Sequence, residues 1–121
     1  MMLRGLMRKY PDQFYPQDWY RGEQFLNGLV GPQIIARASE LGFTNALPLH
    51  QLDANGALPN AATVAALYLA DPTAPIWKQY LWTSDMDRDG QRVYCGTNGK
   101  GFEIHRHIHL TKRFGVILWT R

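Results

Sequence analysis

Three histidines alternate along one segment near the end of the chain. His105, His107 and His109 lie two residues apart, and Glu103 continues the same period. Successive side chains of a β-strand point to opposite faces, so a strand would place all four on one face. Two imidazoles on one strand can reach a single ion, whereas a closed site needs ligands from another strand. The row indicates either a zinc or iron site or a polar strand face turned to solvent.

Three carboxylates alternate before a glycine in a second segment. Asp85, Asp87 and Asp89 precede Gly90, which matches the opening of an EF-hand calcium loop. The bidentate Glu that closes such a loop is missing, since its position holds Gly96. The same residues are typical of a hairpin turn in which Asp side chains bind the backbone. We expect the hairpin turn, with a calcium site as the alternative.

Motifs for other catalytic chemistry are incomplete. Ser39 and Ser84 have no nucleophile-elbow context, and Gly96–Gly101 resembles a phosphate loop only in composition. Cys95 is the only cysteine, which excludes an internal disulfide and a cysteine-based zinc cage. In its strand context Cys95 is expected to be a small buried hydrophobic residue. The sequence therefore favours a protein that is not an enzyme.

Positive charge gathers at the end of the chain, where residues 91–121 contain Glu103 as their one acidic residue. Such an asymmetry suits a nucleic acid or another acidic partner. Lysines and arginines on the outer face of a sheet also improve solubility and protect its edges. The cations in question are Arg92, Lys100, Arg106, Lys112, Arg113 and Arg121.

Aromatic side chains crowd residues 10–25, where two prolines disfavour helix in the residues before them. This segment is expected to be an extended lead-in. Its aromatic residues either cover one end of the core or, with Trp19 and Tyr20 foremost, form a contact surface for a partner or a sugar ring.

Helical spacing of apolar residues occurs twice. The first predicted helix covers Gln33–Leu41, with Gly42 as its C-terminal cap. The second begins after Asn60, a good N-cap, and ends at Asp71–Pro72. Residues 43–60 between them are predicted to form an ordered loop whose leucines fold onto the core.

Strand patterns follow the second helix and are separated by glycine-containing turns. The predicted strands are Trp77–Thr83, Arg92–Cys95, Phe102–Leu110 and Val116–Thr120. The predicted turns are Asp89–Gly90, Asn98–Gly99 and Phe114–Gly115.

The chain is predicted to be one α+β domain over residues 1–121, because this length supports one core but not two. It comprises an aromatic-rich lead-in (1–30), two helices with an ordered loop (31–71) and a mainly antiparallel β-meander (76–121). The N-terminus lacks the apolar run of a signal peptide, and no stretch reaches the length of a membrane span. We expect a cytoplasmic protein without a membrane partner.

The order of elements over residues 33–121 resembles the C-type-lectin-like domains of bacterial and phage proteins. The resemblance rests on Ala36–Leu41, Leu58–Pro59 running into Thr63–Leu67, Tyr80–Ser84 and Val116–Trp119. The chain lacks the disulfides of secreted members, the Trp-Arg that precedes Leu-Pro, and the Glu-Pro-Asn and Trp-Asn-Asp calcium tracts. The resemblance thus implies a lectin-like fold without calcium-dependent sugar binding, and a protein-recognition or adapter role.

We therefore predict a non-enzymatic recognition module that binds a protein partner and needs no cofactor. The binding surface is expected on the aromatic lead-in and on the loops Asp85–Gly90 and Thr97–Gly101. An exposed sheet edge is expected near Val116–Trp119 and would allow a homodimer, although the sequence does not determine the oligomeric state. The expected binding residues are Trp19, Tyr20, Asp85, Asp87, Asp89, Asn98, Lys100 and Arg106.

Two alternatives remain open at this point. One is a small basic nucleic-acid-associated or inhibitor protein of phage or mobile-element type. It would use Arg92, Lys100, Arg106, Lys112 and Arg113. The other is a metal-dependent enzyme built on His105, His107 and His109.

Overall fold

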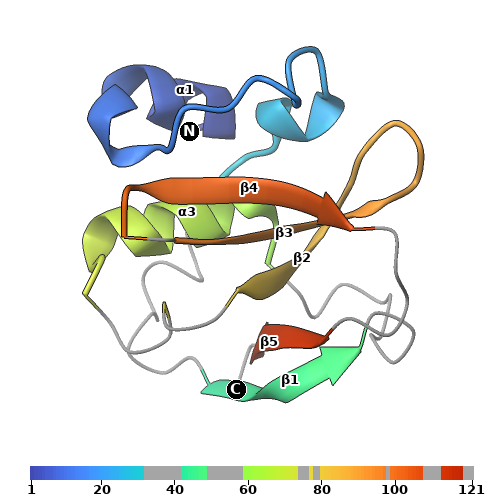
Figure 1. Cartoon of the computed structure of the whole chain (residues 1–121). Helices are drawn as coiled ribbons and strands as arrows, with labels where there is room; N and C mark the ends of the chain where they lie inside the picture. The colour runs from blue at the N-terminus through green and yellow to red at the C-terminus, as the bar shows by residue number, and fades with distance from the viewer. Residues whose placement is uncertain are drawn as a thin grey trace.

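The computed structural model describes residues 1–31, 42–48, 59–73, 77, 80–97, 99–107 and 113–118, with the backbone alone for 42–48, 107 and 113–118. Within these ranges helices and a five-stranded sheet form the α+β fold that the sequence predicts (Figure 1). The helical elements are α1 (Leu3–Lys9), α3 (Ala61–Ala70) and the short 3-10 turns η1 (Pro11–Gln13) and η2 (Gln24–Asn27). The strands are β1 (Gly42–Pro48), β2 (Leu81–Met86), β3 (Arg92–Thr97), β4 (Phe102–His107) and β5 (Arg113–Leu118).

The strands are arranged in the order β1-β5-β2-β3-β4, from bottom to top in Figure 1. The predicted antiparallel meander is confirmed for β2, β3 and β4. It does not continue into β5, which pairs antiparallel with β1 and parallel with β2. The prediction of an exposed edge near Val116–Trp119 is therefore wrong for the part that the structure describes, because β5 lies inside the sheet.

Strand β1 lies within the segment that the sequence predicts as a loop. It pairs with β5 from Gly42 opposite Leu118 to Pro48 opposite Arg113, with an irregularity between Thr44 and Leu47. Gly42, expected as a helix cap, is the first residue of this strand. A proline is tolerated here because β1 is the edge of the described sheet. The predicted helix Gln33–Leu41 lies outside the described residues.

Helix α3 has the start that its sequence predicts. The Asn60 side chain accepts a hydrogen bond of 2.9 Å from the Thr63 amide and so caps the first turn. Val64 and Ala65 are fully buried, and Tyr68 is nearly so. The helix packs against β2, β3 and β4 and also against α1.

Trp77, predicted as the start of a strand, belongs instead to the core beside α3. Its ring packs edge-on against Tyr68 with 5.3 Å between the centroids. The indole N–H donates a 2.9 Å hydrogen bond to the carbonyl of Asp71, next to the end of α3. Strand β2 consequently begins only at Leu81.

The N-terminal segment is part of the core. Leu3 and Leu6 of α1 are buried, and so are aromatic side chains of the lead-in. They pack with α3 and with the inner face of β2, β3 and β4 in one cluster. The lead-in therefore covers one end of the core.

No helix within the described ranges is long and apolar enough to cross a bilayer.

Candidate functional site

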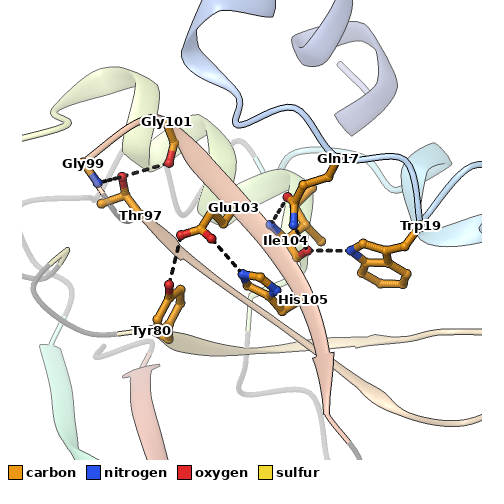
Figure 2. A network of polar contacts seen from close by, with 9 residues as sticks. All are labelled: Gln17, Trp19, Tyr80, Thr97, Gly99, Gly101, Glu103, Ile104 and His105. Carbon is orange, nitrogen blue, oxygen red and sulfur yellow. Dashed lines mark hydrogen bonds and ion pairs between the residues drawn. The ribbon is translucent and has the colours of Figure 1, made fainter.

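The lead-in is fastened to strand β4 by two side chains that bind the backbone of Ile104 (Figure 2). The Trp19 indole donates to the Ile104 carbonyl over 2.8 Å. The Gln17 amide donates to the same carbonyl over 3.1 Å and accepts from the Ile104 amide over 3.0 Å. These bonds satisfy polar groups at the outer edge of the sheet, which would otherwise be open to another strand.

Three of the predicted binding residues meet beside this attachment. The guanidinium of Arg106 lies 4.9 Å from the ring centroid of Trp19. It also donates a 3.2 Å hydrogen bond to Oδ2 of Asp87, whose side chain is fully buried. Tyr20 packs against Trp19 and Phe25 and is only 4% exposed. Its ring covers the core and leaves little area for a partner.

The acidic loop between β2 and β3 is a hairpin turn, as predicted. Oδ1 of Asp87 accepts hydrogen bonds from the amides of Asp89 and Gln91 over 2.9 and 2.8 Å. Asp85 points elsewhere, since its Oδ2 accepts from the amide of Ala61 at the start of α3. Asp89 is exposed. The three carboxylates therefore do not converge on one point.

Burial shifts the pKa of one of these carboxyls. Desolvation raises the pKa of Asp85 above its ordinary value, although the Ala61 N–H and the positive charge of Arg92 oppose the shift. Among the described residues, no group of three or more His, Cys, Asp or Glu side chains is placed to hold a metal ion. The calcium site that the loop suggests stays a prediction.

A salt bridge ties the same loop to the lead-in. Glu23 is 3% exposed, and its Oε1 accepts a 2.7 Å hydrogen bond from Nε of Arg88. Its other oxygen accepts from the backbone amide of Arg88 over 2.9 Å. The loop expected to meet a partner is thus fixed by the first thirty residues of the chain.

A cluster of polar and aromatic side chains occupies the face of the sheet that is opposite the core. Tyr80 donates to Oε2 of Glu103 over 2.9 Å, and Nε2 of His105 lies 3.0 Å from Oε1 (Figure 2). Glu103 and His105 share a face of β4, while Phe102 and Ile104 are buried on the opposite face, as predicted. The histidine face is half covered, because the side chain of His105 is 31% exposed.

Aromatic rings hold this cluster in place. Tyr94 stacks on His105 with 5.2 Å between the centroids and an interplanar angle of 25°. Tyr80 lies over Gly96, where an added Cβ would fall 2.4 Å from its ring. Desolvation and the hydrogen bond to Glu103 raise the pKa of Tyr80 to about 12. At neutral pH its phenol is therefore a hydrogen-bond donor and not a base.

The remaining predicted site residues are distributed over several places. Thr97 closes its turn by donating to the Gly101 carbonyl and accepting from the Gly99 amide (Figure 2). Lys100 is exposed in this turn. Asn98, His109 and the side chain of His107 lie outside the described residues. The three-histidine metal site stays a prediction.

The cations predicted to meet nucleic acid are only partly on the surface. Arg92 is 7% exposed, and its Nη1 donates to the Thr83 carbonyl over 2.9 Å. Arg106 is engaged by Asp87 and Trp19, as described above. Lys112 and the side chain of Arg113 lie outside the described residues. The C-terminal positive charge therefore does not form one continuous surface among the described side chains.

A basic groove that the sequence does not single out lies between α1 and residues 17–26. Its volume is about 520 Å³. Its cations are Arg4 and Arg8 from α1 and Arg21 from the turn at residues 19–22. Within the described part of the chain, no carboxylate forms an ion pair with any of these three arginines. We call this feature the arginine groove.

The rest of the lining is apolar or already hydrogen-bonded. Met7, Tyr20 and Leu26 contribute apolar surface, and Tyr20 and Leu26 are buried below it. Gln17 uses its amide on Ile104. The guanidinium groups of Arg8 and Arg21 are exposed, whereas Nε of Arg4 donates a 3.4 Å hydrogen bond to Oδ1 of Asn27. This arrangement can bind an anion.

The spacing of Arg4 and Arg8 is the sequence signal that points to this groove. Residues four apart lie on one face of a helix, so recognition of α1 would have placed the two cations together. Arg21 is brought to them only by the tertiary fold.

Comparisons with protein-family models, curated proteins and solved structures found no match.

Proposed function

We propose that this protein is a non-enzymatic recognition module that binds an acidic region of a protein partner through the arginine groove. The observation that carries the proposal is the convergence of Arg4, Arg8 and Arg21 on one groove without an acidic partner among the described residues. Three cations gathered from two elements repel one another, and an anionic ligand would remove that repulsion.

The chemistry of a guanidinium supports an acidic ligand. Its planar group of N–H donors matches the two oxygens of a carboxylate, and the resulting charge-assisted bonds are stronger than neutral ones. The apolar side chain of Met7, which is half-buried, would contact the aliphatic part of the same ligand. A protein segment offers both kinds of group.

Two described side chains, those of Cys95 and Tyr80, support a binding role over catalysis. Cys95 is fully buried, and desolvation raises the pKa of its thiol well above the ordinary value. The phenol of Tyr80 stays protonated at neutral pH because its pKa is raised to about 12. Neither group is prepared to attack a substrate.

Binding of labelled poly-L-glutamate, followed by fluorescence anisotropy at low salt, tests the proposal. We expect Arg8→Gln to weaken binding about twofold to fivefold, which is the range for one exposed ion pair. The triple substitution of Arg4, Arg8 and Arg21 by Gln should weaken it more than about tenfold.

Lys9→Gln is the matched control. Lys9 is an exposed cation of the same helix, and it lies over the ring of Tyr10 and not in the groove. It changes the net charge as Arg8→Gln does, so a specific groove predicts less than about twofold loss for this variant. Equal losses for both substitutions, or no binding by the native protein, would overturn the proposal.

A further inference from the structure

The arginine groove, on whose proposed binding function this inference rests, takes two of its cations from one helix and the third from a separate turn. Arg4 and Arg8 are four residues apart in α1, which separates them by about 6 Å along the helix axis. Both line the groove. Arg21 enters from the turn at residues 19–22, on the side that α1 does not form.

We infer that the ligand is an extended chain segment with three consecutive acidic residues. In an extended chain, residues i and i+2 lie about 6.5 Å apart and point to the same side, while residue i+1 points to the other. The outer two carboxylates then have the spacing that Arg4 and Arg8 have along the axis of α1. The middle one is left for Arg21, the cation of the lining that α1 does not supply. One short run of acidic residues engages all three cations.

A helical ligand fits the groove less well. A helix with its side chains is about 10–12 Å wide and packs through interdigitated apolar side chains. Here α1 contributes Arg4, Met7 and Arg8 to the groove, so two of its three residues are charged. An extended segment needs the width of only one chain and presents its charges to both walls.

The aromatic residues near the groove favour carboxylates of a protein over a nucleic acid. Single-stranded nucleic acids bind where bases can stack on open aromatic faces. Tyr20, the aromatic residue in the described lining, is only 4% exposed. The neighbouring Trp19 has its indole N–H bonded to Ile104 and its ring covered by Arg106.

Three labelled probes of equal charge test the inference on the chain of residues 1–121. Two are peptides with blocked termini, one containing Glu-Glu-Glu between glycines and the other Glu-Gly-Gly-Glu-Gly-Gly-Glu. The third is a thymidine tetranucleotide with three phosphates. We expect the contiguous peptide to bind about fivefold more tightly than the spaced peptide, because only the former reaches all three arginines at once.

Variants show whether this preference arises in the groove. Arg21→Gln removes the cation that faces the middle carboxylate, so it should reduce the preference to less than about twofold. Lys9→Gln should leave the preference unchanged. A circular dichroism spectrum and an unfolding curve for each variant show that the fold is retained.

The outcomes separate this inference from the proposed function. Equal binding of the two peptides, with a loss on Arg8→Gln, overturns the inference and leaves the groove as an anion site. The same holds if neither peptide binds while poly-L-glutamate binds in an Arg8-dependent way. Failure of poly-L-glutamate as well overturns both. Tighter binding of the tetranucleotide replaces the protein ligand with a nucleic acid.

Discussion

At the scale of single residues, the carboxylate of Glu103 is buried and doubly hydrogen-bonded on the outer face of the sheet. It is 6% exposed and takes one hydrogen bond on each oxygen, from Tyr80 and from the ring of His105. A buried carboxylate is costly unless its oxygens are bonded. The two donors therefore contribute to stability through Glu103.

Tyr80→Phe removes one of these donors and keeps the ring. We expect the free energy of unfolding to fall by about 1–2 kcal/mol, because a bond to a charged acceptor is lost in a part-buried site. Urea denaturation followed by tryptophan fluorescence measures the change. In a Glu103→Gln background the same substitution should cost clearly less, and an equal cost in both backgrounds would contradict the assignment.

Asp85 provides a prediction for the pH dependence of stability. Burial raises its pKa above 3.8. A raised carboxyl pKa contributes stability that is complete below pH 3.8 and is lost as the pH rises through the folded-state pKa. Asp85→Asn carries no charge, and its side-chain oxygen can still accept from the Ala61 amide. The stability of this variant relative to the native protein should therefore increase between pH 3.8 and pH 7.

Urea denaturation at several pH values in this window measures the difference. Asp89→Asn, which removes the same charge from an exposed residue of the same turn, controls for net charge. A difference between Asp85→Asn and the native protein that stays constant or shrinks with rising pH would count against a raised pKa.

Residue types and local spacing explain which contacts were predictable. The shared face of Glu103 and His105 follows from the period of a strand, and the turn around Asp87 follows from its own backbone bonds. The contact of Arg106 with Trp19 and Asp87 joins three distant segments. No local pattern encodes such a contact, which is also why the position of Arg21 in the arginine groove is visible only in the fold.

At the scale of elements, α3 shows how a local signal determines a helix start. Asn60 accepts from Thr63 with its side-chain oxygen and donates to the Leu29 carbonyl over 2.7 Å with its nitrogen. Asn60→Ala should lower the free energy of unfolding by about 1–2 kcal/mol, since both bonds are lost.

Asn60→Asp separates the two roles of this residue. Aspartate keeps the capping acceptor and loses the donor to Leu29, so its stability should fall between those of the native protein and Asn60→Ala. Urea denaturation of the three proteins tests this order. An Asp variant as unstable as the Ala variant would mean that the cap itself contributes little.

Two elements were missed for different physical reasons. Strand β1 contains Asn45 and Pro48, which are poor strand formers, and it is a strand because β5 pairs with it. Helix α1 has Leu3, Leu6 and Met7 at helical spacing, but it is short, contains Gly5 and has no side-chain cap. Its stability comes from packing on α3, so the tertiary fold determines both elements.

At the scale of the whole molecule, the placement of β5 between β1 and β2 joins the end of the chain to its middle. A meander pattern predicts only that strands joined by short turns lie side by side. It therefore cannot predict this order. The resemblance of residues 33–121 to C-type-lectin-like domains stays a prediction. The structure adds that residues 1–31 are built into the same core.

This integration of the N-terminal segment leads to a prediction about stability. Leu3 is fully buried within the cluster that contains α3 and the sheet, whereas Leu29 is 64% exposed. Leu3→Ala should lower the free energy of unfolding by about 2–4 kcal/mol through lost burial and the cavity left behind. Leu29→Ala, the matched control, should change it by less than about 0.5 kcal/mol.

Global unfolding in urea, followed by both tryptophan fluorescence and circular dichroism, shows whether the lead-in unfolds together with the rest of the domain or separately from it. The four tryptophans of the chain include Trp19 in the lead-in, Trp77 beside α3 and Trp82 in β2. If the lead-in is part of one cooperative core, Leu3→Ala shifts a single transition that both probes report at the same urea concentration. If the lead-in unfolds separately, Leu3→Ala moves an early fluorescence change and leaves the main circular dichroism transition in place. That second result would contradict a single core and would restrict the cooperative domain to the residues after the lead-in.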